Sequence, residues 1–311
     1  PSKGDKFGVG KVIKVAAGHG TLGRAVKEAS AGDTLSLGSG EYVEPKMIVI
    51  DKPLLVSSEG FGKRNKKASV GISFEKSALF EIRNGGSLSL QGLNISGALA
   101  PDGAGNSVIR TLRRSMLYNY EILIDDIHVS ALDINHSFDF LSVSKGSFAD
   151  RITISNSSFE NVTGAILALD KESDDYGIYN AEYVTIRNSS FKNIKGDLVD
   201  FYRGGTDEST FGPHFELSNS KLVNIGLGKR NKSKSAILLH GVQVTNMHKN
   251  KIVDSAVVKV EHTVGEPVTK VVGNRFVNSP KVTVRELNSD KKNTAILSGN
   301  DYFSSNKKTN N

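Results

Sequence analysis

Three aligned positions in the second half of the chain carry side chains that could transfer protons or bind an acidic ligand. Mostly apolar runs at 198–201, 236–239 and 257–260 can be superimposed, and the residues that follow them then share one offset. These residues are Tyr202, His240 and Glu261. The next position holds Arg203, Gly241 and His262. A phenol, an imidazole and a carboxylate in a row could move protons, and a guanidinium beside them could hold a carboxylate.

The spacing leaves three interpretations of this column open. It could catalyse proton transfer on a sugar acid, it could bind such a ligand, or it could be a polar ladder that only stabilises the fold. Arg203 is the strongest candidate for a carboxylate contact, because its planar fork can hold one through two hydrogen bonds. Glu266 in the loop 263–267 adds a carboxylate near the column, and the loop 204–208 adds two more.

The column recurs because the chain itself repeats. The clearest copies, at 152–162 and 184–194, place alternating β-forming residues before an Asn turn and an apolar residue three positions after it. Weaker copies have their turn residue at Gly92, Asp126, Asn219, Asn250, Asn274 and Asn300. Successive turn residues are 24 to 34 positions apart, and recurrence at such a period indicates a solenoid of stacked coils.

The segments between the turns predict short strands. They are runs of four to six residues rich in Val, Ile, Leu and Phe, broken by Asn, Gly and Ser, and no coil has room for a crossover helix. One coil cannot bury its inner face alone, so the coils must stack and pair in parallel. We therefore predict an all-β fold, a right-handed parallel β-helix. Asn suits its corners because it tolerates left-handed backbone and can form ladders between coils.

One helix is expected, at about 21–30. Thr21 could be its N-cap. The apolar stripe of this segment consists of Leu22, Ala25, Val26 and Ala29. An amphipathic helix before the first coil would cover the open end of the solenoid, although a helix that binds a partner is the alternative. We expect one domain over 1–303 and a disordered tail at 304–311.

Composition excludes several classes of function. The chain has no cysteine, so it can form no disulfide, no cysteine-ligated zinc site and no thiol nucleophile. No run approaches the roughly 18 apolar residues of a membrane span, and no membrane partner is expected. The chain is basic, with 40 Lys and Arg against 33 Asp and Glu.

Two loops concentrate this positive charge. They share a basic phrase, at 62–67 and at 228–234. Their basic residues are Lys63, Arg64, Lys66, Lys67, Lys229, Arg230, Lys232 and Lys234. Such loops attract polyanions, or they are only solvated connections between strands. The sequence holds no Trp, no aromatic stacking platform and no recognition module, which favours an acidic polysaccharide over nucleic acid.

The run 202–215 resembles the C-terminal β-helix of two-domain alginate lyases in polysaccharide lyase family six, relatives of chondroitinase B. The segments 177–184, 239–243 and 261–267 show the same resemblance, as does the opening through 31–42. The resemblance covers most of the chain. It implies a fragment of a secreted or periplasmic bacterial alginate lyase that lacks an N-terminal catalytic β-helix.

The resemblance also implies where the chemistry takes place. These lyases cleave links between uronates by β-elimination, in which the carboxylate is neutralised, a base removes the proton on C5 and an acid protonates O4. The family's neutraliser is Ca²⁺, with a Lys base and an Arg acid, all in the N-terminal domain. In this chain Leu stands before His240-Gly241 where that Arg would be. The resemblance thus implies no catalytic residue, metal or cofactor here.

We therefore expect a domain that packs against the catalytic domain and shapes the alginate cleft, with Tyr202, Arg203, His240 and His262 as contacts to uronate or to the partner domain. Two alternatives come from other classes. The chain could be a self-sufficient, metal-independent lyase with Tyr202 and His240 as base and acid and Arg203 as neutraliser. It could also be a purely structural or carbohydrate-binding solenoid. A pectin-type hydrolase would need closely paired carboxylates, and only the loop-like doublet 174–175 is adjacent in the middle coils.

Overall fold

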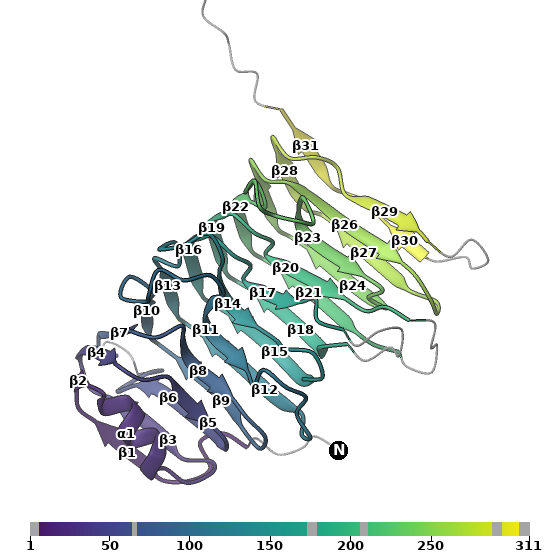
Figure 1. Cartoon of the computed structure of the whole chain (residues 1–311). Coiled ribbons are helices and arrows are strands. Elements are labelled where there is room, and N and C mark those ends of the chain that lie inside the picture. The colour runs from purple at the N-terminus through teal and green to yellow at the C-terminus, as the bar shows by residue number, and fades with distance from the viewer. Residues whose placement is uncertain (1–5, 64–66, 173–178, 206–210, 288–293, 305–311) are drawn as a thin grey trace, which may run out of the picture.

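The computed structural model describes residues 6–63, 67–172, 179–205, 211–287 and 294–304. Within these residues the chain winds into stacked coils whose strands form three long sheets (Figure 1). All the pairings between neighbouring strands are parallel, and each sheet receives strands from successive coils. This is the predicted parallel β-helix. Residues 305–311 of the predicted tail lie outside the described part.

The three sheets run the length of the solenoid. The first consists of β1 (Val12–Val15), β3 (Thr34–Leu37), β6 (Pro53–Ser58), β9 (Ser87–Gln91), β12 (Tyr120–Asp125), β15 (Ala149–Ser155), β18 (Ala181–Arg187), β21 (His214–Ser218), β24 (Val244–His248), β27 (Val268–Val272) and β30 (Thr294–Ile296). The second consists of β2 (Gly18–His19), β4 (Gly40–Glu44), β7 (Val70–Phe74), β10 (Asn94–Ser96), β13 (His128–Ser130), β16 (Ser158–Val162), β19 (Ser190–Ile194), β22 (Lys221–Ile225), β25 (Lys251–Val253), β28 (Arg275–Val277) and β31 (Asp301–Phe303). The third consists of β5 (Ile48–Ile50), β8 (Ala78–Ile82), β11 (Asn106–Thr111), β14 (Phe138–Ser142), β17 (Leu167–Leu169), β20 (Val199–Tyr202), β23 (Ser235–His240), β26 (Val257–His262) and β29 (Thr283–Glu286).

The interior is one continuous apolar core. Side chains at equivalent positions of successive coils stack on one another, as Phe159 does on Phe191 with ring centroids 5.1 Å apart. This stacking follows from the parallel register, in which Phe159 pairs with Phe191 and Phe191 with Leu222. The repeat in the sequence is therefore the repeat of the core.

The helix α1 (Thr21–Glu28) packs against β1, β4 and β5 at the N-terminal end of the solenoid (Figure 1). Its stripe of apolar residues is buried, as predicted. The predicted N-cap is wrong, because Gly20 in the left-handed region holds that position and Thr21 is the first helical residue. The Glu44 carboxylate instead accepts hydrogen bonds from the backbone N–H of Leu22 (3.0 Å) and Gly23 (3.1 Å). A carboxylate stabilises these N–H groups, which a helix leaves without an internal partner.

The predicted turn residues divide into two groups. The left-handed residues at one corner include Gly92, Asp126, Asn156, Asn188 and Asn219, as predicted. In the last coils the prediction is displaced by one residue, because Lys249, Gly273 and Gly299 have the positive φ. The Asn residues that follow them have another role.

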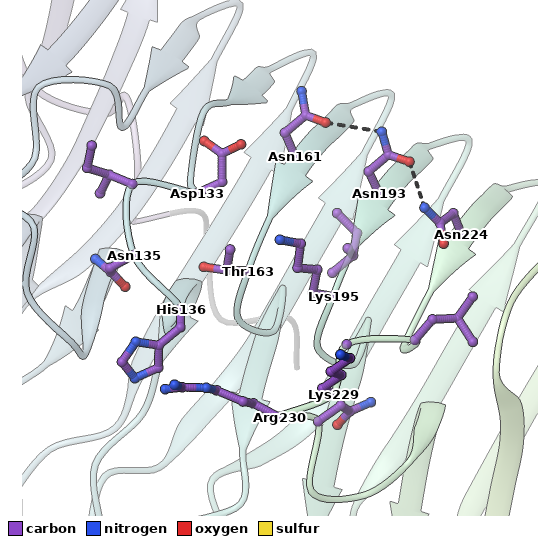
Figure 2. A pocket seen from close by; sticks show the side chains of 15 residues that line it. Asp133, Asn135, His136, Asn161, Thr163, Asn193, Lys195, Asn224, Lys229 and Arg230 are labelled. Atoms are coloured by element: carbon purple, nitrogen blue, oxygen red, sulfur yellow. Dashed lines mark hydrogen bonds between the residues drawn. The ribbon is translucent and has the colours of Figure 1, made fainter.

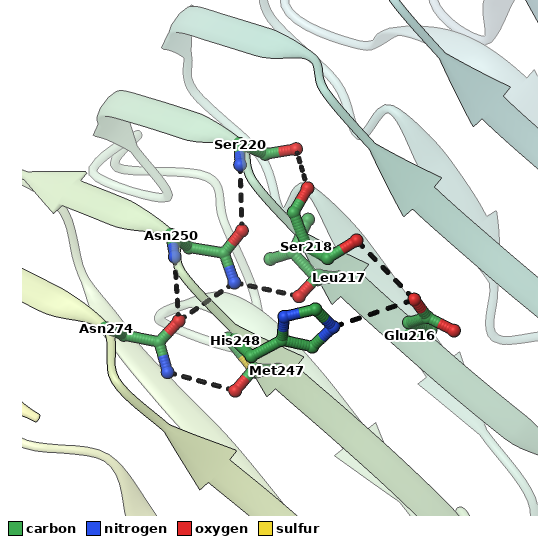
Figure 3. A network of polar contacts seen from close by, with 8 residues as sticks. All are labelled: Glu216, Leu217, Ser218, Ser220, Met247, His248, Asn250 and Asn274. Atoms are coloured by element: carbon green, nitrogen blue, oxygen red, sulfur yellow. Dashed lines mark hydrogen bonds and ion pairs between the residues drawn. The ribbon is translucent and has the colours of Figure 1, made fainter. Parts of the chain in front are cut away.

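Asn250, Asn274 and Asn300 form an internal ladder at that corner, of which Figure 3 shows Asn250 and Asn274. The Asn250 amide donates to Leu217 O at 2.8 Å and to Asn274 Oδ1 at 2.9 Å. Ser220 holds the equivalent position in the coil before and donates its N–H to Asn250 Oδ1 at 3.0 Å. The sequence alignment matched Asn219, which is a turn residue, with Asn250, which belongs to the ladder. The predicted turn was therefore one residue too late in the coils where Asn replaces Ser in the ladder.

Candidate functional site

The third sheet brings the predicted column together. Tyr202 pairs with His240 across β20 and β23, and His240 pairs with Glu261 across β23 and β26. The column continues to Arg285 on β29, which the sequence analysis did not include. Because parallel neighbours lie about 4.8 Å apart, these four side chains are consecutive on one surface.

The four side chains contact one another in order. The Tyr202 ring stacks on the His240 imidazole, with centroids 4.4 Å apart and planes 7° from parallel. His240 Nδ1 lies 2.6 Å from Glu261 Oε2, and Arg285 Nη1 lies 3.7 Å from Glu261 Oε1. Tyr202 is 39% exposed, whereas the His240 and Glu261 side chains are 17% and 18% exposed. The Arg285 side chain is 68% exposed. The carboxylate therefore orients the imidazole, and the phenol and the guanidinium at the two ends of the column are its members most open to a ligand.

The next position along these strands does not join that surface. Arg203 is 1% exposed, and its guanidinium carbon lies 5.6 Å from the centroid of the Tyr179 ring. His262 is fully buried, with Nδ1 2.7 Å from Glu286 Oε1 and Nε2 2.8 Å from Thr269 Oγ1. Successive residues of a strand point to opposite faces, which separates these two from the column. Both side chains are therefore buried in this chain, and their predicted role as contacts to uronate or to the partner domain stays a prediction.

Of the remaining predicted carboxylates, the structure describes only Glu266. Glu266 is exposed in the loop between β26 and β27. The acidic pair of the loop 204–208 and the doublet 174–175 lie outside the described residues.

Acidic residues that the sequence analysis missed lie on the same sheet. Burial, with the charges of Asp170 and Asp197 added, raises the pKa of Asp200 to about 7. Burial likewise raises the pKa of Asp139 to about 6, although its carboxylate accepts the N–H of Ala165. An acidic residue inside an apolar strand, as Asp200 is in the run 197–202, is the sequence signal that could have found them.

The second basic loop borders a groove at the corner between the second and third sheets (Figure 2). Lys229 and Arg230 line this groove, and Lys232 and Lys234 are exposed in the same loop. In the first loop Lys67 forms an ion pair with Asp126 at 2.7 Å, and Lys63 is exposed. Arg64 and Lys66 lie outside the described residues.

The column does not fit calcium. Ca²⁺ takes six to eight oxygen ligands, whereas the column offers the one carboxylate of Glu261, which already contacts His240 and Arg285. Among the described residues no group of three or more His, Asp or Glu could hold a metal ion. No helix in the described part of the chain is long and apolar enough to cross a membrane.

Solved structures show what this fold is related to. The structure of the PL6 family alginate lyase AlyGC matches with a TM-score of 0.91 and 43% sequence identity over 95% of this chain. The chain is related to the PL6 family alginate lyases. An arginine-to-alanine mutant of AlyGC matches at 0.92 with 43% identity over 97% of the chain. No family model and no curated protein matches the chain.

The relationship to PL6 alginate lyases confirms the resemblance carried by the run 202–215 at the level of the family. It also has a defined extent. This chain spans 40% of the length of AlyGC and 41% of the length of the mutant. Most of each relative therefore lies outside the matched region.

Proposed function

We propose that this chain is the C-terminal, non-catalytic β-helix of an alginate lyase, where it packs against a catalytic N-terminal β-helix and shapes the cleft for the polyuronate. The relationship at 43% identity over a stretch that makes up 40% of AlyGC is the observation that carries the proposal. Such an enzyme would act on a polymer outside the cytoplasm, so we expect it to be secreted or periplasmic.

The geometry of the column favours binding over catalysis. β-Elimination needs a group that neutralises the uronate carboxylate, together with a base and an acid placed on the same sugar. Arg203, the neutraliser of a self-sufficient lyase, is buried beside Tyr179, and Arg285 lies at the far end of the column beside Glu261. The exposed phenol of Tyr202 can donate a hydrogen bond to a sugar hydroxyl or carboxylate, and the His240–Glu261 pair holds its ring in place.

Activity measurements on separate and joined domains test this proposal. We expect chain 1–311 alone to produce no unsaturated uronate from alginate, followed by ultraviolet absorbance. Fusion to a catalytic N-terminal β-helix should give activity, and chelation of Ca²⁺ should remove it if that domain holds the metal. Steady cleavage by chain 1–311 alone, lost in Tyr202→Phe or His240→Ala, would instead establish the self-sufficient lyase.

Variants of the fused enzyme separate a cleft role from a structural one. Tyr202→Phe should raise KM for alginate several-fold with kcat little changed, because it removes a contact that is equally strong in the ground state and the transition state. Tyr183→Phe is the matched control, since Tyr183 also stacks on a histidine, His214, at 4.7 Å but on the first sheet. If Tyr202→Phe and Tyr183→Phe have the same KM and kcat, the column has no role in the cleft and only stabilises the solenoid.

A further inference from the structure

We propose that the groove at the corner between the second and third sheets is a separate binding site for a linear acidic polysaccharide. It is built from the segment 227–231, which includes the first residues of the second basic loop, together with Lys195, His136 and a ladder of asparagines. The choice of a polyuronate as the ligand rests on the proposed function. The site itself needs no catalytic domain, and direct binding tests it independently of activity.

The basic wall of the groove is held in place by a buried carboxylate. Asp197, 4% exposed, accepts hydrogen bonds on Oδ1 from Asn231 Nδ2 (3.1 Å), Ser233 Oγ (2.6 Å) and Ser235 Oγ (3.2 Å). Asn231 also donates to Gly226 O and Ser235 O, which closes the loop on itself. Lys229 and Arg230 therefore project from an ordered loop, and less conformational entropy is lost when they bind a ligand.

One side of the groove is lined by a regular row of amides. Asn193 Nδ2 donates to Asn161 Oδ1 at 3.1 Å, and Asn224 Nδ2 donates to Asn193 Oδ1 at 3.0 Å (Figure 2). All three residues have left-handed backbone at the end of their strands, with φ between 57° and 59°. Each amide spends part of its hydrogen-bonding capacity on its neighbours, and the rest can serve the hydroxyl groups of a sugar.

Positive charge dominates the lining. Lys195, Lys229 and Arg230 line the groove together with a single acidic residue, Asp133. Figure 2 shows the His136 and Arg230 side chains directed toward one another, from the opposite wall and from the basic loop. A carboxylate between them would gain charge-assisted hydrogen bonds.

The shape of the groove suits an extended ligand. It has a volume of about 880 Å³ and draws residues from four successive coils, represented by Asp133, Thr163, Lys195 and Leu227. Three steps of about 4.8 Å make it roughly 14 Å long, enough for several sugar units. No Phe, Tyr or Trp lines it, so it lacks the stacking platform of single-stranded nucleic-acid sites.

The groove is distinct from the column. Its residues precede the strands of the third sheet, whereas Tyr202 and His240 end them. Along β23 (Ser235–His240) this separation is about 16 Å, at about 3.3 Å per residue.

Titration of chain 1–311 with size-defined alginate oligosaccharides tests the site. Lys229→Gln/Arg230→Gln should weaken binding about tenfold, the effect of losing two exposed charge contacts. Lys232→Gln/Lys234→Gln removes the same charge from the same loop but from residues that do not line the groove, so its affinity should change less than twofold. Equal losses in both pairs would show diffuse attraction and overturn the site.

Two further measurements complete the test. The proton NMR signals of the His136 imidazole, identified with His136→Gln, should shift on addition of oligosaccharide, and those of His240 report separately on the column. Shifts confined to His240, or no binding at all, would overturn the groove. Tighter binding of oligo-dT than of alginate would assign it to nucleic acid instead. If the groove binds alginate oligosaccharides but the fused enzyme shows no lyase activity, the proposed function would be refuted and the binding site would stand.

Discussion

Removal of the Asp197 side chain should loosen the basic loop and destabilise the coil that it closes. Three donors converge on one oxygen of this buried carboxylate, from Asn231, Ser233 and Ser235. At about 1 kcal/mol for each hydrogen bond, and more where the acceptor is charged, Asp197→Ala should lower the free energy of unfolding by about 3–5 kcal/mol.

Asp197→Asn should have a much smaller effect. Asn keeps the oxygen that all three donors reach, and burial raises the pKa of Asp197 against the hydrogen bonds that lower it, so the charge itself adds little stability. We expect a loss of about 1 kcal/mol. The difference in unfolding free energy between the wild type and Asp197→Asn should narrow as pH rises. As pH rises through its raised pKa the buried Asp197 ionises and the wild type becomes less stable, whereas Asn does not titrate.

Urea unfolding followed by circular dichroism measures these differences, with the m-value as a check that the solenoid still unfolds as one unit. The control is Asp102→Ala, the same truncation at an exposed position, which should stay within about 0.5 kcal/mol of wild type. Trypsin should also cut at Lys229 and Arg230 faster in Asp197→Ala. A loss below about 1 kcal/mol in the Ala variant, or equal losses in Ala and Asn, would refute this account of the loop.

Three further predictions test the buried groups. His262→Phe should lower the unfolding free energy by about 2–4 kcal/mol in urea, because Thr269 and Glu286 lose their partner; a change under about 0.5 kcal/mol would contradict the buried network. The Asp200 pKa of about 7, raised by burial from the ordinary 3.8, means that this group's stabilisation is complete below about pH 4 and is lost as pH rises through 7. Asp200→Asn should therefore flatten the decline in the free energy of unfolding over that range, a decline of about 2 kcal/mol after allowance for partial exposure, and an unchanged pH profile would count against it. Phe191→Ala removes a buried ring at the end of the aromatic stack, where it packs on Phe159, and should cost about 3–5 kcal/mol by urea unfolding; a cost near zero would show that the core is not packed there.

The column was predictable from the sequence, and the surroundings of its neighbours were not. Parallel coils place residues of equal offset beside one another, so aligned apolar runs were enough to pair Tyr202 with His240 and Glu261. Arg203 lies one residue beyond the end of β20, and His262 is the last residue of β26. Both are buried, and the side chains that they contact, Tyr179 for Arg203 and Thr269 and Glu286 for His262, come from other parts of the chain.

The polar caps and ladders show the same division. An Asn with left-handed backbone and an Asn inside the coil give the same letter in the sequence, which is why Asn250 was taken for a turn. The carboxylate that caps α1 comes from Glu44, two strands further along the chain, and local sequence around the helix contains no sign of it.

The sequence by itself determined the repeat, the parallel stacking of its coils, the helix at the end and the relationship to alginate lyases, because these depend on local patterns of residues along the chain. Only the tertiary structure decided which side chains meet. The groove joins His136 to Arg230 from coils far apart in sequence, since loops of unequal length hide the register that backbone pairing imposes. Burial, which separates a ligand contact from a structural residue, likewise depends on how every coil stacks on the next.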